Sequence, residues 1–86
     1  MQESKIILQK TIAEIIKEYR LKEKKSISLI SNEINLSKSI WSQVEKGVKD
    51  IQISTLWRIC EALEIPLSTL ILEIEKRTKG KINFLE

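Results

Sequence analysis

The segment Ile27–Lys46, ISLISNEINLSKSIWSQVEK, is the part of the sequence that is most informative about the fold. Its first half repeats isoleucine at helical spacing, and a second helical pattern begins after Ser37. A serine just before such a pattern can cap the helix N-terminus, a role open to both Ser26 and Ser37. Asn35 lies between the two patterns, and asparagine tolerates the left-handed conformation in which many helices end. The stretch therefore predicts two short helices joined by a tight turn.

The second of these helices has an apolar face and a polar face. Trp41 and Val44 are spaced to point inward, and Gly47 ends the helix. The polar face and the loop after it carry the candidate DNA-binding residues Ser37, Lys38, Ser39, Ser42, Gln43, Lys46 and Lys49. Lysine can bind phosphate or guanine, glutamine can pair with adenine, and serine can donate to phosphate or base edges. We interpret the pair as a helix-turn-helix that binds double-stranded DNA; the alternative is a solvated polar face.

Three further helical patterns surround this motif. They cover residues 4–24, residues 53–63, and a stretch from Pro66 towards Gly80. Ser4 is placed to cap the first of them. Two glycines and one proline are too few for the many tight turns of a β-sandwich or barrel. The fold expected is therefore all-α.

We expect a compact five-helix bundle that forms one domain over residues 1–80. Its helix-turn-helix core is residues 27–46, and residues 81–86 form a C-terminal tail. Both tryptophans, Trp41 and Trp57, are expected in the core, because helical spacing directs them inward. Cys60 is expected to be a small buried hydrophobic residue.

Composition excludes several classes of function. The chain has no histidine and one cysteine, which removes histidine-based catalysis, tetrahedral zinc sites and an intramolecular disulfide. Its carboxylates are spaced as helical partners of lysines, so we expect no enzyme, no metal and no cofactor. Uninterrupted apolar runs are too short to span a membrane, and a lone thiol fits a reducing cytoplasm. The net charge of +3 permits a nucleic-acid partner without requiring one.

The segments Leu36–Gly47 and Ser54–Ser68 resemble the XRE-type, lambda-repressor-like helix-turn-helix family. The resemblance covers about residues 8–72 and implies a DNA-binding regulator that is encoded by a bacterium or a phage and acts in the cytoplasm. It also implies a structural salt bridge between Arg20 and Glu45, which would fix the recognition helix.

The chain departs from the family pattern at three positions. Ile27 stands where a glutamine usually holds a backbone phosphate, so that contact requires another donor such as Ser26 or Ser28. Trp41 replaces a smaller aliphatic residue, and Ile51 replaces a common proline.

The last helix carries an apolar stripe that decides the expected assembly. Leu67, Leu70, Ile71 and Ile74 are the candidate dimer interface. A homodimer would place two recognition helices about one DNA turn apart, ~34 Å, and read an inverted-repeat operator. The alternative is that this stripe only closes the core of a monomer.

Three roles suit such a chain. It resembles a phage-type repressor or the controller of a restriction–modification system, either of which would regulate its own synthesis. The alternative is the antitoxin of a toxin–antitoxin pair, whose main task is to bind a protein. A toxin or RNA polymerase is accordingly a candidate protein partner.

Overall fold

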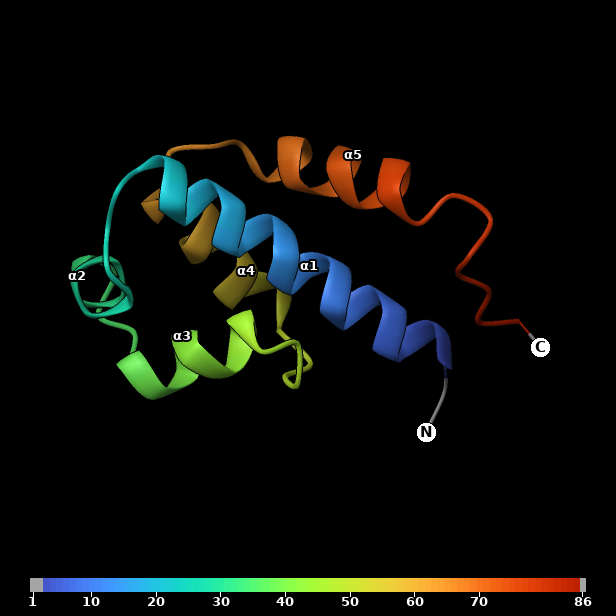
Figure 1. Ribbon diagram of the computed structural model, residues 1–86, viewed down its shortest axis with the longest axis horizontal. Coiled ribbons are helices and arrows are strands. Elements are labelled where there is room, and N and C mark those ends of the chain that lie inside the picture. Colours follow the sequence, from blue (N-terminus) through green and yellow to red (C-terminus); the bar gives the residue numbers. More distant parts are fainter. Residues whose placement is uncertain (1–2, 86) are drawn as a thin grey trace.

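The computed structural model describes residues 3–85. Within them the chain forms helices and connecting turns, with no strand (Figure 1). The helices are α1 (Glu3–Lys22), α2 (Ile27–Glu33), α3 (Lys38–Glu45), α4 (Ile53–Ala62) and α5 (Leu67–Arg77). The expected all-α fold is confirmed, and the observed bounds lie within a few residues of the predicted ones.

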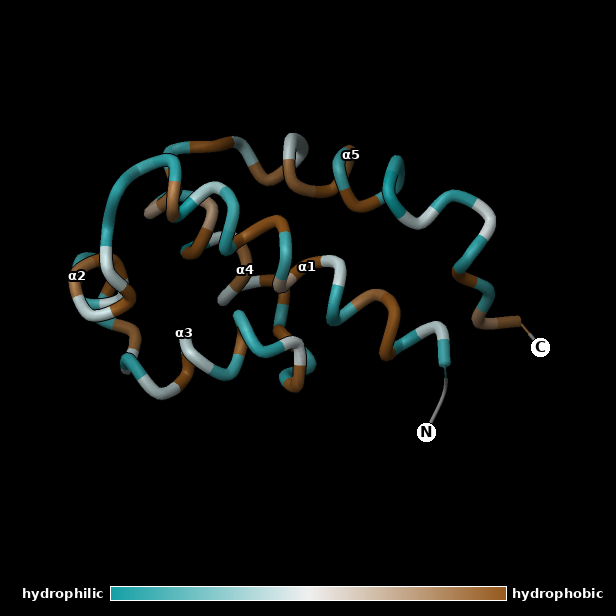
Figure 2. The backbone as a smooth tube through the Cα atoms, viewed as in Figure 1, coloured by the Kyte–Doolittle hydropathy of each residue, from teal (hydrophilic) through white to brown (hydrophobic). Residues whose placement is uncertain are grey.

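Long helix α1 is the centre of the bundle. It packs against α3 on one side and α5 on the other, while α2 contacts α3 and α4, and α4 contacts α5 (Figure 1). Hydrophobic segments recur between hydrophilic ones along each helix, as expected when one stripe of each helix is buried (Figure 2). The core is formed by Ala13, Ile15, Ile16, Ile30, Trp41, Val44, Leu56, Ile59, Cys60, Ala62, Leu63, Leu70 and Ile74.

Local hydrogen bonds explain where the two motif helices begin. The Ser26 hydroxyl oxygen accepts from the backbone N–H of Leu29, and Ser37 accepts from Ile40, each over 3.1 Å. Both predicted N-caps are therefore confirmed. Each bond satisfies one of the backbone donors that a helix leaves free in its first turn.

Non-glycine residues in the left-handed conformation end three of the helices. Asn35 follows α2 with φ of 54°, as the sequence predicts, and its backbone conformation reverses the chain into α3. Lys24 after α1 and Glu64 after α4 adopt the same conformation, with φ of 56° and 59°. Lysine and glutamate tolerate this conformation less well than glycine, because a Cβ atom crowds the following carbonyl.

Two sequence expectations about single residues are wrong. Ser4 lies inside α1, and its hydroxyl joins α1 to the tail: it donates to the Asn83 carbonyl over 3.0 Å and accepts from the Asn83 N–H over 2.8 Å. Trp57 is 57% exposed on α4. Its neighbours Leu56, Ile59 and Cys60 occupy the buried stripe, and Trp57 lies at the edge of that stripe.

None of the helices within residues 3–85 combines the length and the apolar character that crossing a membrane requires.

Candidate nucleic-acid interface

The outward face of α3 gathers five of the predicted DNA-binding residues. A shallow cleft on the surface is lined by Lys38, Ser39, Ser42, Gln43 and Lys46. Ser42 is half-buried and the other four are exposed. The cleft is thus bordered by amine, amide and hydroxyl groups, which are the donors and acceptors that base edges and phosphates bind.

The other two predicted residues flank this cleft. Ser37 is exposed and caps α3, so its oxygen accepts a backbone hydrogen bond while its O–H remains a donor. Lys49 is half-buried in the loop that follows Gly47. Both therefore lie at the ends of the recognition helix, where side chains contact the phosphate backbone more readily than base edges.

The inward face of α3 anchors it to the bundle. Trp41 is fully buried and Val44 is 1% exposed, as the sequence predicts. The bulky indole at position 41 is therefore accommodated in the core. Its Nε1–H donates to Glu45 Oε2 over 2.6 Å, so the ring also makes a buried polar contact within α3.

Arg20 of α1 holds the last turn of α3 through Glu45. Arg20 Nε donates to Glu45 Oε2 over 2.6 Å, and its Nη2 donates to Oε1 over 2.9 Å. The expected salt bridge is present and bidentate, with side chains only 10% and 6% exposed. A further bond runs from Arg20 to the Lys25 carbonyl over 2.8 Å. The hydrogen bond to Glu45 raises the pKa of the Arg20 guanidinium above its ordinary value.

This network also sets the charge of the DNA-facing side. Glu45 is the only acidic residue in α3, and its carboxylate is turned inward to Arg20 and Trp41. The outward face therefore carries Lys38 and Lys46 without an opposing carboxylate from the same helix. A positive face of this kind suits a polyanionic partner.

A contact at the turn between α2 and α3 was missed in the sequence. Arg58 of α4 donates from Nη2 to the backbone carbonyl of Ile34, the C-cap residue of α2. This carbonyl belongs to the last turn of a helix, where acceptors lack partners within the helix. No local pattern relates positions so far apart in the chain, so sequence spacing could not have found the contact.

Gly47 permits a close approach that was also not predicted. With φ of +72° it ends α3, and a Cβ atom there would lie 3.1 Å from Lys10 Cα. The C-terminal end of α3 is therefore pressed directly against the backbone of α1. A larger residue would require Lys10 to move by a few tenths of an ångström and would also be strained by the positive φ.

Ile27 packs against the hydrophobic core, where its side chain offers no hydrogen bond. A second cleft lies beside it between the start of α2 and the start of α3, and includes Ser26, Ser28 and Lys38 in its lining. Both serines are exposed, and Ser26 caps α2 only as an acceptor, so its O–H remains a donor like that of Ser28. Either serine can therefore offer a hydroxyl to a phosphate.

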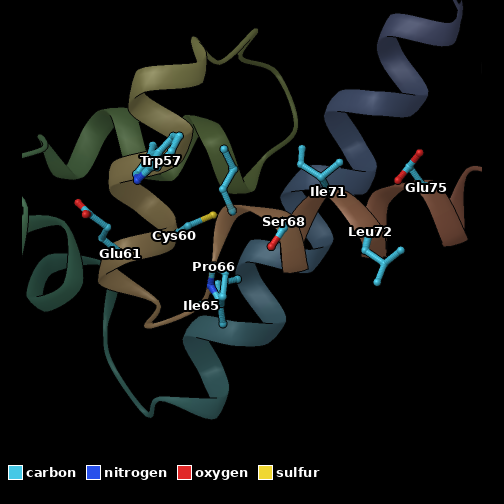
Figure 3. Close-up of a pocket in the computed structure, with 10 residues that line it drawn as sticks. Trp57, Cys60, Glu61, Ile65, Pro66, Ser68, Ile71, Leu72 and Glu75 are labelled. Carbon is cyan, nitrogen blue, oxygen red and sulfur yellow. The ribbon is translucent and has the colours of Figure 1, made fainter.

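The predicted dimer stripe is only partly at the surface. Leu70 and Ile74 are 0% and 7% exposed, so these two assignments are wrong: both side chains close the core of the single chain. Leu67 is half-buried and Ile71 is 38% exposed. The apolar surface here shifts instead towards Leu72 and, from α4, Trp57 (Figure 3).

The order of the helices, the capped turn and the polar outward face define a helix-turn-helix protein. The chain belongs to the helix-turn-helix family HTH_3, whose model matches residues 16–70. The resemblance inferred from the sequence is confirmed.

Curated relatives carry the name transcriptional regulator ClgR. The protein of that name from Mycobacterium tuberculosis is 22% identical over 71 residues, which cover 83% of this chain. The same match covers 63% of the relative, so this chain spans less than two thirds of its length.

Solved structures share the fold at low sequence identity. A mutant of the restriction–modification controller protein C.Esp1396I matches with a TM-score of 0.76 and 20% identity, over 86% of this chain and 94% of its own. The clp gene regulator ClgR from C. glutamicum gives 0.77 and 16%, over 86% and 96%. A transcriptional regulator from Vibrio cholerae gives 0.77 and 23%, over 94% of this chain and 46% of its own.

Proposed function

We propose that this protein is a sequence-specific, DNA-binding transcriptional regulator that acts as a repressor or autoregulator in the cytoplasm of a bacterium. The observation that carries this proposal is the cleft lined by Lys38, Ser39, Ser42, Gln43 and Lys46, on the outward face of a helix that is anchored inside the bundle. Membership of the helix-turn-helix family supports it. No enzymatic role is proposed.

Residues of α3 divide into those that read bases and those that bind phosphate. Gln43 and Lys38 are exposed within the cleft and have the side chains that pair with adenine and guanine edges. Lys46 and Lys49 lie at the C-terminal end of α3 and in the loop beyond it, and we assign them to phosphates. Ser26 or Ser28 supplies a further phosphate donor, because Ile27 stands where the family usually has a glutamine.

Two copies of the chain would bind one operator. A two-fold dimer places two recognition helices about one DNA turn apart, ~34 Å, and reads an inverted repeat. The exposed apolar side chains of Trp57 and Leu72 support an interface on α4 and α5. A small domain also has a thin core, which favours burial against a second copy.

Selection of binding sites from random double-stranded DNA tests the function directly. We expect the purified protein to enrich one inverted repeat with half-sites a helical turn apart. On that site, Gln43→Ala should weaken binding by roughly 1–3 kcal/mol and relax the preference at one base position. Lys46→Ala should weaken binding to specific and random DNA alike and reduce the salt dependence. Recovery of no common sequence would contradict the proposal.

An antitoxin role is a second candidate, favoured by the exposed end of the chain. Phe84 is 47% exposed and Leu85 is 98% exposed, so the tail presents apolar side chains that a protein partner could bury. Co-purification of a toxin that the chain neutralises would establish this role, and a Phe84→Ser, Leu85→Ser variant should lose it. Binding to RNA polymerase would be tested in the same way, by comparing the natural chain with the Phe84→Ser, Leu85→Ser variant.

A further inference from the structure

Helix α1 begins well before the residues that match the family model. The match starts at residue 16, whereas α1 starts at Glu3, so the first part of this helix lies outside the matched segment. Two contacts place this part beside the C-terminal end of α3. Lys5 forms an ion pair over 3.1 Å with Asp50, in the loop that follows α3. Lys10 Cα lies only 3.1 Å from the position that a Cβ atom of Gly47 would occupy.

A small cleft lies between α1 and the C-terminal end of α3, which pack against each other (Figure 1). Its volume is about 300 Å³, and it is lined by Lys10, Ala13, Glu14, Glu45 and Lys46. Lys46 also lines the α3 cleft described above, so the two clefts adjoin at this residue. The polar surface of the recognition helix therefore continues past Lys46 onto α1.

Positive charge prevails at this second cleft. Lys10 and Lys46 are exposed, and neither forms an ion pair with any residue of 3–85. Glu45 also lines the cleft, but its carboxylate is neutralised by Arg20. Glu14 is exposed and is the other acid of the lining. Two lysines thus face one carboxylate that no cation neutralises.

An anion can approach this end of α3 only with the help of positive side chains. The free carbonyls at the C-terminal end of a helix carry partial negative charge, which repels a phosphate. Lys46 alone would have to offset this charge as well as bind the phosphate. Lys10 supplies a second ammonium group from a different helix, and lysine binds phosphate as a compact point charge. The two lysines together therefore suit a backbone phosphate.

We propose that α1 is part of the DNA interface, and that Lys10 and Lys46 together bind one backbone phosphate at the cleft between α1 and α3. This inference rests on the DNA-binding function proposed above. The contact reads no base, because a phosphate carries no sequence information. It fixes the C-terminal end of α3 against the duplex from outside the helix-turn-helix, while Gln43 and Lys38 read the bases.

The salt dependence of DNA affinity tests this contact. The dissociation constant is measured by fluorescence anisotropy at several salt concentrations, on the sequence that site selection recovers and on a random duplex. Lys10→Gln should weaken binding to both by a similar factor, roughly fivefold to tenfold at about 0.1 M salt, because one phosphate contact and its counterion release are lost. The slope of log affinity against log salt should become shallower by about 1. Glu14→Gln should strengthen binding to both duplexes, since a carboxylate that repels the phosphate is removed.

Lys76→Gln is the matched control. Lys76 is exposed on α5, which packs on the other side of α1 from α3, so the variant loses the same charge away from the cleft (Figure 1). Its salt slope should equal that of the natural chain. Lys10 and Lys76 are both exposed positions in helices, so each variant should keep the urea midpoint of the natural chain.

The outcomes separate this contact from the proposed function. A Lys10→Gln protein that binds DNA like Lys76→Gln overturns the contact, and so does a loss confined to the selected sequence. If the natural chain selects one DNA sequence and Lys10→Gln keeps the natural slope, the contact fails and the function stands. If the natural chain binds every duplex alike and Lys10→Gln makes the slope shallower, the contact stands and the sequence-specific function fails.

Discussion

Replacing Arg20 with methionine tests whether the salt bridge to Glu45 stabilises the fold. Methionine keeps most of the length and apolar volume of the arginine stem but has no charge and no donor. In the variant, Glu45 retains one side-chain hydrogen bond, from Trp41 Nε1 over 2.6 Å. Water cannot replace the lost arginine as a partner of the carboxylate, since the Glu45 side chain is only 6% exposed.

The structure suggests a large effect. Removing one partner of a buried ion pair typically costs about 3–5 kcal/mol, because a buried charge is left uncompensated. We expect ~3 kcal/mol here, at the lower end of that range, since the Trp41 bond remains. A chain of 86 residues has a free energy of unfolding on the order of 4–13 kcal/mol, so the variant should stay folded at low temperature.

Urea denaturation followed by helical circular dichroism measures the effect. The midpoint should fall for Arg20→Met with little change in slope, as expected when only stability changes. The double variant Arg20→Met, Glu45→Gln removes both charges, and its glutamine oxygen can still accept from Trp41. It should regain most of the lost stability, to within about 1 kcal/mol of the natural chain.

Two outcomes would refute this reasoning. A loss below about 1 kcal/mol for Arg20→Met would mean that the pair behaves like an exposed one. A double variant as unstable as the single variant would mean that the arginine acts by packing alone. Unchanged DNA affinity in a folded Arg20→Met protein would further show that the bridge does not orient α3.

Three other perturbations have clear expected outcomes. Gly47→Ala should lower the unfolding free energy by more than Gly80→Ala. Both glycines have positive φ, but only at Gly47 would an added Cβ atom be crowded by a neighbour. Equal decreases in the unfolding free energy, measured by urea denaturation, would contradict this. Burial raises the pKa of Cys60 from 9.0 to about 11, so any stability it contributes is present below pH 9 and is lost as pH rises towards 11. The stability difference from Cys60→Ala should shrink over that interval, and a constant difference would refute the assignment. Ser4→Ala should accelerate hydrogen exchange at the Asn83 amide by removing its acceptor, and unchanged exchange would show that the tail is held by other contacts.

Much of the fold follows from local signals in the sequence. Ser26 and Ser37 are caps that act within three residues, and Asn35 is a residue suited to a left-handed turn. These features need no knowledge of the rest of the chain. The inward positions of α3 follow equally from helical spacing, so Trp41 and Val44 were placed correctly.

The errors arise where burial depends on a neighbouring helix. Leu70 and Ile74 belong to an apolar stripe that serves either a core or an interface, and only the packing of α5 on α1 decides between them. The exposed position of Trp57 is consistent with helical spacing. Leu56, Ile59 and Cys60 already form a complete buried stripe, and position 57 lies about 100° from position 56 around the helix.

The candidate site likewise contains residues that helical spacing predicts and a contact that it does not predict. Spacing alone places Lys38, Ser39 and Gln43 on one outward face, and the structure brings them together in the α3 cleft. Arg58 could not be predicted, because its partner is the carbonyl of Ile34, far away in the chain and invisible in any side-chain pattern. Backbone acceptors at helix ends are therefore where such sequence reasoning is weakest.

The left-handed turns at Lys24 and Glu64 bear on how long the protein survives in a cell. Each non-glycine residue there costs about 1 kcal/mol, so the two together raise the unfolded population roughly 30-fold over a chain with glycine at both positions. Proteases degrade mainly the unfolded form of a small domain. Ordinary residues at these two turns thus expose a larger fraction of the chain to proteases than glycine would.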